Sequence, residues 1–163
     1  SAAQSVAAIN PDVRVVAVHE RVDGARLRAL VAAADVELAC RAHFPPRTAV
    51  NAACVRARRP LVSGAAIRFE GQLAVFDLRS GGPCYACLYP DVGEAQETCE
   101  EAGVPGPVVG TIGSLQALAA LKLLLGIGDD AAHLLVWDAL SMNWRRLRIS
   151  ADPHCPVCGV PHV

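Results

Sequence analysis

Two C-x-x-C pairs constrain the fold of this chain more than any other feature. Cys84 and Cys87 stand in GGPCYACLYP, and Cys155 and Cys158 stand in DPHCPVCGVPHV near the other end of the sequence. Each pair has a proline and a glycine beside it, which is typical of turns. Four thiolates presented by two such turns are the ligand set of a tetrahedral structural Zn²⁺. The sequence therefore predicts that these four cysteines hold one Zn²⁺ and bring two distant segments together.

A redox pair and cysteines without a shared role are the alternatives to a metal site. A thioredoxin-like redox motif is one C-x-x-C that opens a helix after a strand, whereas this chain has two pairs, and we expect neither to open a helix. The count of seven cysteines is odd, and the start SAAQSVAAIN lacks the basic region and apolar run of a secretory signal. We therefore expect a cytoplasmic protein, in which C-x-x-C serves metal or redox chemistry.

Composition limits the remaining possibilities. The chain has 163 residues, of which 53% are hydrophobic and 19% charged, as in a globular protein with a single domain over residues 1–163. The formal net charge of −1 argues against a nucleic-acid-binding protein, because such proteins depend on contacts with phosphates. A closed four-cysteine site has no open coordination position, so we expect it to stabilise the fold and not to catalyse a reaction.

The first part of the chain alternates between strand and helix patterns. A helix over the first nine residues ends at Asn10, because Pro11 cannot continue the hydrogen-bond ladder. Asp23 is the expected N-cap of the next helix. We expect helices over residues 23–33 and 47–59 and strands over residues 13–18, 36–40 and 60–66. Alternation at this spacing indicates an α/β fold with parallel strands.

The pattern changes after residue 66. Residues 67–78 form an extended apolar stretch with no helix after it, so we expect an antiparallel strand at a sheet edge. Residues 133–139 and 143–149 are expected to form a hairpin. The apolar segment 103–128 is nearly long enough for a membrane span. Its helical pattern starts only after Gly113, however, and a helix that is apolar all round is also typical of an α/β core, so we expect no membrane span.

Six motifs in order along the chain resemble a known family. They are NPDV, VNAACV, PLVSGAAIRFEGQLAVF, CYACLYP, TCEEAGVPGPVVGTIGSLQALAALKLL and CPVCG. Together they resemble the C-terminal part of the MoeB/ThiF group, which are prokaryotic relatives of ubiquitin-activating enzymes. The resemblance implies a Rossmann-like ThiF-type sheet, with parallel strands, antiparallel edge strands and a four-cysteine zinc site.

The resemblance also implies a function. Members of the group use Mg-ATP to adenylate the C-terminal glycine of a small ubiquitin-like sulfur carrier protein of the MoaD/ThiS type, for molybdopterin or thiamine synthesis. They are typically homodimers. The group begins with a strand and a Gly-rich loop that holds the ATP phosphates, and no G-x-G-x-x-G occurs in this sequence. The chain is therefore expected to be the C-terminal portion of an adenylating domain, without the N-terminal nucleotide-binding half and inactive by itself.

The sequence departs from the group at one functional stretch. Where the group usually has Asp-Cys-Thr-Asp-Asn followed by an arginine, this chain has ACRAHFPPR. Ala42 and His43 thus stand in place of the second aspartate, which helps to hold Mg-ATP, and of the asparagine, while Arg47 keeps the arginine. The resemblance makes His43 and Arg47 the candidate nucleotide-binding residues, although a lone loop histidine can also be simply solvated. Alanine cannot ligate a metal, so a catalytically degenerate binding module for a ubiquitin-like partner is the alternative.

Cys99 is the candidate catalytic residue. It matches the position at which some members of the group carry a cysteine that forms a thioester or persulfide, which leaves a thiol-based sulfurtransferase as a third possibility. The glutamates around it would raise the pKa of the thiol, so an ordinary loop cysteine is the other interpretation. Cys40 ends an expected strand, where α/β ligand crevices form, and Cys54 is an expected core residue.

Overall fold

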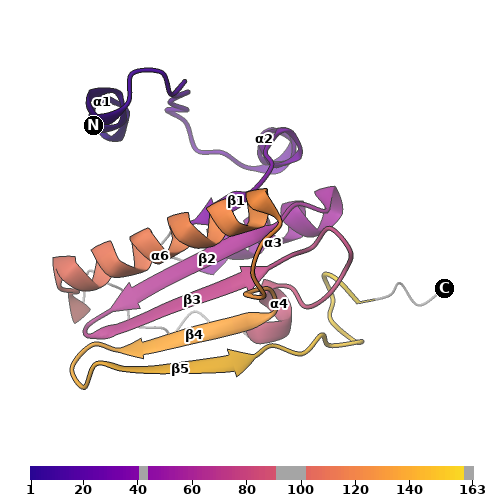
Figure 1. The fold of residues 1–163 in the computed structure, drawn as a ribbon. Coiled ribbons are helices and arrows are strands. Elements are labelled where there is room, and N and C mark those ends of the chain that lie inside the picture. The colour runs from indigo at the N-terminus through magenta and orange to yellow at the C-terminus, as the bar shows by residue number, and fades with distance from the viewer. Residues whose placement is uncertain (41–43, 91–101, 160–163) are drawn as a thin grey trace.

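The computed structural model describes residues 1–40, 44–90 and 102–159. Its helices are α1 (Ala2–Ile9), α2 (Gly24–Ala33), α3 (Phe44–Ala57), α4 (Tyr85–Leu88) and α6 (Gly106–Leu125). Its strands are β1 (Glu37–Ala39), β2 (Leu61–Ile67), β3 (Glu70–Phe76), β4 (His133–Asp138) and β5 (Asn143–Arg148). The strands form one sheet in the order β1-β2-β3-β4-β5 (Figure 1).

Only the first strand pair of this sheet is parallel. β1 pairs with β2 in the parallel sense, and β2 with β3, β3 with β4, and β4 with β5 are antiparallel. This is the mixed α/β sheet that the sequence predicts. The expected strands 36–40 and 60–66 and the expected C-terminal hairpin are confirmed, with bounds that differ by at most one residue. The helix ending at Asn10 and the helix after Asp23 are also confirmed, although the Asp23 side chain makes no capping hydrogen bond.

The expectation that residues 67–78 form an edge strand is wrong. β2 extends to Ile67, the chain turns at Arg68 and Phe69, and β3 returns in the middle of the sheet, between β2 and β4. Consecutive residues from Leu73 to Phe76 are all buried, so β3 is covered on both faces. An uninterrupted apolar run is typical of a strand that is covered in this way. The run LAVF therefore marks a central strand.

The expected strand over residues 13–18 is also absent from the structure. Val13 is 48% exposed and Val16 is 68% exposed, and this stretch pairs with none of the described strands. An extended segment becomes a strand only when its backbone groups find a partner. Among the described strands β1 pairs only with β2. In Figure 1, α1 and the chain after it lie apart from the sheet, and no residue of α1 is buried.

The hydrophobic core has one layer on each face of the sheet. One layer joins α2, α3 and α4 to side chains such as Phe76, Leu134 and Val136. The other layer joins α6 to Val62, Leu73 and Val75 of the central strands. Alternate residues of β2, β3 and β4 thus supply the two layers, as the two-residue period of a strand requires.

Helix α6 begins at Gly106, earlier than the expected start after Gly113. Pro105 and Pro107 stand at its first turn, where no intrahelical N–H bond is lost. By length and composition it is the one helix of the described chain that could cross a membrane. It packs along the sheet, however, through Val108, Ile112, Gln116, Ala119 and Ala120. Its opposite face is exposed, at 53% for Leu118 and 56% for Leu121, so the helix is buried on one side only.

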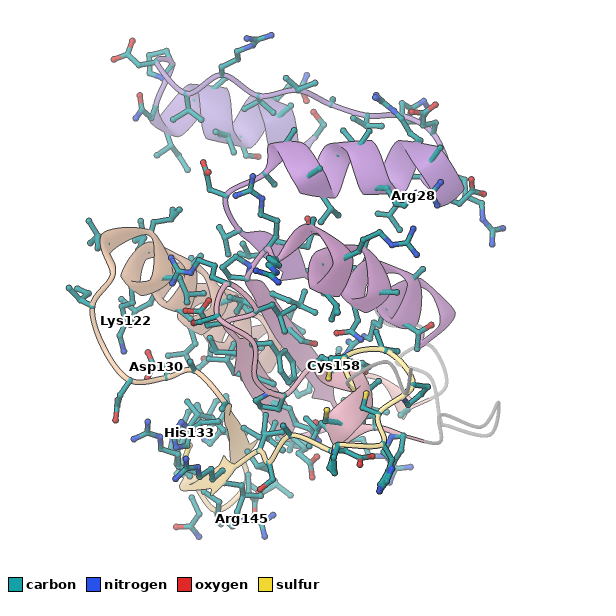
Figure 2. The ribbon with its side chains drawn as sticks, turned by 90° about the vertical axis from the view of Figure 1, so that its right-hand side faces the viewer. Arg28, Lys122, Asp130, His133, Arg145 and Cys158 are labelled. Atoms are coloured by element: carbon teal, nitrogen blue, oxygen red, sulfur yellow. The ribbon has the colours of Figure 1, made fainter. Side chains whose placement is uncertain are left out.

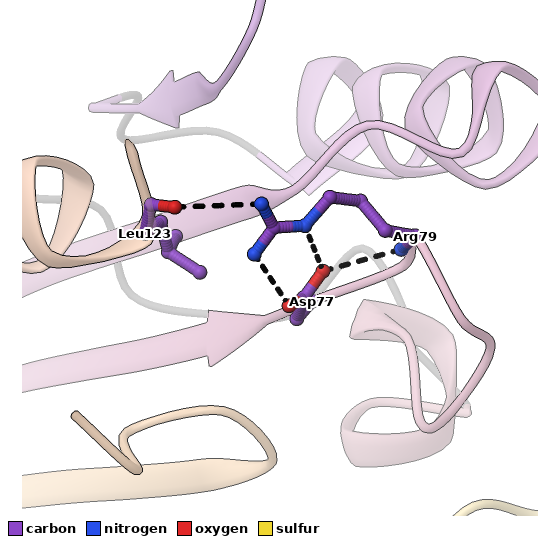
Figure 3. Close-up of polar contacts among 3 residues, drawn as sticks. All are labelled: Asp77, Arg79 and Leu123. Carbon is purple, nitrogen blue, oxygen red and sulfur yellow. Dashed lines mark hydrogen bonds and ion pairs between the residues drawn. The ribbon is translucent and has the colours of Figure 1, made fainter. Parts of the chain in front are cut away.

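An arginine clamp fastens the far end of α6 to the sheet (Figure 3). Arg79 donates from Nε to Asp77 Oδ1 at 2.8 Å and from an η nitrogen to Asp77 Oδ2 at 2.7 Å. The other η nitrogen lies 3.4 Å from the carbonyl oxygen of Leu123 in the last turn of α6. The hydrogen bond from Arg79 lowers the pKa of Asp77. This clamp joins the end of β3 to the helix C-terminus, whose partial negative charge favours a cation.

Candidate functional site

The four cysteines of the two C-x-x-C pairs meet at one point of the structure. The Sγ atoms of Cys84, Cys87, Cys155 and Cys158 all lie within 4.8 Å of one another. The distance is 3.7 Å between the sulfurs of Cys84 and Cys155 and 3.4 Å between those of Cys87 and Cys158. A tetrahedral ion with Zn–S bonds of about 2.3 Å places its sulfurs about 3.8 Å apart. The predicted convergence is confirmed, and the cluster can hold one metal ion (Figure 2, sulfurs around Cys158).

Each pair is held by its own turn. Cys84 is the N-cap of the one-turn helix α4, and its backbone N–H points to Cys87 Sγ at 3.5 Å. The expectation that neither pair opens a helix is therefore wrong for the first pair. In the second pair the N–H of Gly159 donates to the carbonyl oxygen of Cys155 at 2.9 Å. A Cβ atom on Gly159 would lie 2.5 Å from that oxygen, so only glycine fits this turn.

Two of the four thiols are packed into the core. Cys84 is 0% exposed and Cys155 is 5% exposed, whereas Cys87 and Cys158 are half-buried. Burial raises the pKa of Cys84. Burial and the neighbouring thiols Cys84, Cys87 and Cys155 raise the pKa of Cys158. At Cys155 burial is outweighed by hydrogen bonds from the backbone of Cys158 and Val157, which lower its pKa to about 7. Four thiols this close together, two of them buried, can all ionise only beside a cation, which is the chemistry of a metal site.

A buried amide joins this cluster to helix α3. Asn51 is 1% exposed, and its Nδ2 lies 3.5 Å from the sulfur of Cys84. Its Oδ1 accepts a hydrogen bond of 3.0 Å from the backbone N–H of Tyr85, the first residue of α4. In the sequence, this asparagine stands out only as part of the motif VNAACV. Its position in an otherwise apolar helical segment was the available indication of a special role.

A second buried amide lies at the carboxyl end of β1. Gln116 of α6 is 3% exposed, and its Nε2 donates to the carbonyl oxygens of Ala39 at 3.2 Å and Val62 at 3.4 Å. Its Oε1 lies 3.4 Å from Cys40 Sγ. Gly64 leaves room for it, since a Cβ there would lie 2.3 Å from Gln116 Cδ. Ligand crevices in open α/β sheets form at such strand ends, and sequence reasoning missed this residue.

The candidate nucleotide and catalytic residues are only partly described. Arg47 is 8% exposed and donates from an η nitrogen to the carbonyl oxygen of Gly64 at 3.1 Å, so its side chain reaches from α3 to β2. The prediction that it contacts a nucleotide stays a prediction. His43, Ala42 and Cys99 lie outside the described residues.

Cys54 and Cys40, the other two described cysteines, lie where the sequence predicts. Cys54 is 0% exposed, and burial with the nearby charge of Glu37 raises its pKa to about 12, so it is a core residue. Cys40 is exposed and directly follows β1. Its position at the strand end agrees with the sequence-based expectation.

A cavity of about 200 Å³ lies between α6 and the β4–β5 hairpin. Its apolar floor includes Leu73, Leu115 and Leu135. Its charged groups are paired: Lys122 forms an ion pair with Asp130 (Figure 2), and Arg146, which lines the same cavity, bonds Asp129 at 3.2 Å. Both cations of the lining are thus already engaged by carboxylates.

Comparison with known proteins gives consistent results. The sequence matches the ThiF family over residues 1–157. It is 44% identical over 160 residues to a molybdopterin-synthase adenylyltransferase of Escherichia coli (strain K12), covering 98% of this chain and 64% of the relative. It is also 44% identical over 156 residues to a sulfur carrier protein ThiS adenylyltransferase of the same strain, covering 96% of this chain and 62% of the relative. The chain thus spans slightly less than two thirds of the length of these curated relatives.

The fold is shared with solved structures of lower sequence identity. A crystal structure of E. coli MccB with MccA-N7isoASN matches with a TM-score of 0.78 and 15% identity, over 97% of this chain and 50% of that chain. This likeness concerns the fold alone. Because the family match covers residues 1–157, nearly the whole chain, the chain belongs to the ThiF family.

Proposed function

We propose that the protein containing this chain is an adenylyltransferase that activates the C-terminal glycine of a small ubiquitin-like sulfur carrier protein. The observation that carries the proposal is the identity of 44% to a molybdopterin-synthase adenylyltransferase and to a ThiS adenylyltransferase, each over nearly the whole chain. In this reaction a carboxylate oxygen of the carrier forms a bond to the α-phosphorus of ATP, and the bond to pyrophosphate breaks. Equal identity to the two enzymes supports the carrier class without choosing between molybdopterin and thiamine synthesis.

The four-cysteine cluster is proposed to hold a structural Zn²⁺. The sulfur–sulfur distances and the all-thiolate donor set suit a tetrahedral Zn²⁺. Such a site stabilises the fold by joining α4 to the C-terminal turn. With four protein ligands it offers no position for a substrate, so its role in the reaction is to keep the surrounding elements in place.

The nucleotide is proposed to bind at the carboxyl end of β1. At this point Gln116 joins the last residue of β1, Ala39, to Val62 of the neighbouring strand β2. His43 and Arg47 are the candidate residues for contact with Mg-ATP, and Cys99 is the candidate thiol for a later covalent step. We also propose a cytoplasmic homodimer, as is typical of the family.

The test is ATP–pyrophosphate exchange by the intact natural protein. With Mg-ATP and its cognate MoaD/ThiS-type carrier, radiolabel from pyrophosphate should appear in ATP, and a carrier that lacks its terminal glycine should abolish the exchange. No exchange above the no-carrier control with either class of carrier would contradict the proposal. Replacement of Cys99 by serine should leave the exchange intact, because adenylation precedes any thiol step.

A catalytically degenerate binding module is the second candidate. The observation in its favour is Ala42, which stands where the family usually has an aspartate that helps to hold Mg-ATP. Calorimetric titration of the carrier into the intact protein distinguishes the two functions. The adenylyltransferase should produce pyrophosphate on addition of Mg-ATP, whereas the binding module should bind the carrier equally tightly with and without ATP and release none.

A further inference from the structure

We propose that Asn51 orients the Cys84 sulfur for the metal without binding the metal itself. Asn51 also connects helix α3 to the metal site. The inference rests on the proposed metal at the four cysteines and is independent of adenylation. Asn51 belongs to neither C-x-x-C pair, so the spacing of the cysteines does not predict this role.

The geometry of the amide defines the role. One side-chain nitrogen lies 3.5 Å from the sulfur of Cys84, a normal distance for an N–H···S bond, and the side-chain oxygen accepts from the N–H of Tyr85 at 3.0 Å. The bond from Tyr85 fixes which end of the amide is the oxygen, because a backbone N–H needs an acceptor. The amide N–H is thereby directed at the thiolate.

Burial makes this contact energetically important. Asn51 and Cys84 are 1% and 0% exposed, so water does not replace the amide as donor. A thiolate that accepts no hydrogen bond in an apolar core donates its full negative charge to the metal. A hydrogen bond from an N–H group stabilises part of that charge on the sulfur. Residues of this kind fix the orientation of a ligand and tune the metal, and their loss typically costs about 10–100-fold in metal affinity.

The contact also connects the metal site to the nucleotide end of the molecule. Arg47 and Asn51 lie one turn apart on α3, so their side chains point to the same side of the helix. Arg47 reaches the carbonyl oxygen of Gly64 on β2, and Asn51 reaches Cys84 at the start of α4. The metal, through Asn51, therefore holds the helix that directly follows residues 41–43.

The test compares two buried amides in the intact protein. Asn51→Asp keeps the shape and the bond from Tyr85 but removes the donor to Cys84 and adds a negative charge beside it. Gln116→Glu is the matched control, because it makes the same amide-to-carboxylate change at an equally buried position that contacts none of the four clustered cysteines. The readout is the rate of Zn²⁺ release to an excess of a coloured chelator.

Zn²⁺ release should be at least about tenfold faster for Asn51→Asp and unchanged for Gln116→Glu. Equal release rates for Asn51→Asp and wild type would overturn the role of Asn51 while leaving the metal site in place. Wild-type protein that binds no Zn²⁺ would instead overturn the metal site itself.

A measurement on the wild-type protein covers the case in which a variant does not fold. After exchange of the metal for an NMR-active cadmium isotope, a scalar coupling should pass from cadmium through the Cys84 sulfur to an Asn51 side-chain amide proton. Cadmium bound by all four cysteines without that coupling would contradict the proposal.

Discussion

At the scale of single residues, the structure depends on a few buried polar side chains with complete partners. Asn51 and Gln116 are both almost fully buried amides, and each joins a helix to a neighbouring element through two or three contacts. A buried amide is stable only when its donors and acceptors are used. Asn51 therefore fixes the position of α3 against α4, and Gln116 fixes the position of α6 along the sheet. Apolar contacts alone would allow each helix more than one position.

The contact between Gly64 and Gln116 gives a residue-scale prediction. Gly64→Ala should lower the free energy of unfolding by about 1–3 kcal/mol, because the new Cβ would lie 2.3 Å from Gln116 Cδ. In a Gln116→Ala background the same change should cost much less, since the obstructing side chain is gone. Urea denaturation of the four proteins of this cycle measures the coupling.

The control for this cycle is Gly110→Ala on α6, where a new Cβ meets no atom within 4 Å. It should stabilise the helix by about 0.5–1 kcal/mol. An equal cost of Gly64→Ala with and without Gln116 would show that the two residues do not share space in solution.

Local sequence pattern identified the four clustering cysteines but not these amides. The two C-x-x-C pairs carry their chemistry in their spacing, so the cluster of four thiols could be predicted. Asn51 and Gln116 became meaningful only when the fold placed a thiol or a strand carbonyl beside them. No residue close to either amide in the sequence reveals that partner, because the partners come from distant segments.

At the scale of elements, the sheet shows which strand predictions are reliable. The runs in β1, β2, β4 and β5 were recognised because their apolar pattern is local. The central position of β3 was not recognised, because the order of strands in the sheet depends on the hairpin connections and on burial of both faces. Residues 13–18 have the apolar pattern of a strand but pair with no strand of the described chain. The pattern alone therefore predicted a strand that the structure does not contain.

The arginine clamp gives an element-scale prediction with a defined pH dependence. Arg79 lowers the pKa of Asp77 from its ordinary 3.8, so the folded state favours the ionised carboxylate. The stabilisation is therefore complete above that pH and is lost as the pH falls through the lowered pKa. Arg79→Met should reduce the free energy of unfolding at pH 7 by about 0.5–1 kcal/mol, since Arg79 is half exposed.

Chemical denaturation between pH 7 and pH 2 measures the difference between wild type and this variant. The difference should shrink at the acidic end. Arg28→Met on α2 is the matched control, because Arg28 is exposed and lies on another element (Figure 2). A difference for Arg79→Met that stays constant with pH would mean that the clamp acts by packing and not by charge.

At the scale of the whole molecule, the four-cysteine cluster joins distant parts of the chain. It connects α4, directly after the central strands, to the last described turn and, through Asn51, to α3. Removal of the metal should lower the melting temperature of the intact protein by about 5 °C or more. It should also make residues 152–159 accessible to protease.

Addition of Zn²⁺ should reverse both effects, and addition of Mg²⁺ should not, because thiolates prefer Zn²⁺. Thermal melting monitored by circular dichroism, with and without a chelator, measures the change. A melting curve that the chelator leaves unaltered, in protein shown to have lost its metal, would contradict a stabilising role for the cluster.

Adenylation of a sulfur carrier by the protein containing this chain is tested most directly by intact-mass spectrometry of the carrier. The intact protein, Mg-ATP and the carrier are mixed without a sulfur donor, and the carrier mass is recorded before hydrolysis can remove the product. The carrier should become heavier by one adenylyl group, and a carrier without its C-terminal glycine should keep its mass. A carrier that binds the protein but keeps its original mass in the presence of Mg-ATP would contradict adenylation as the function.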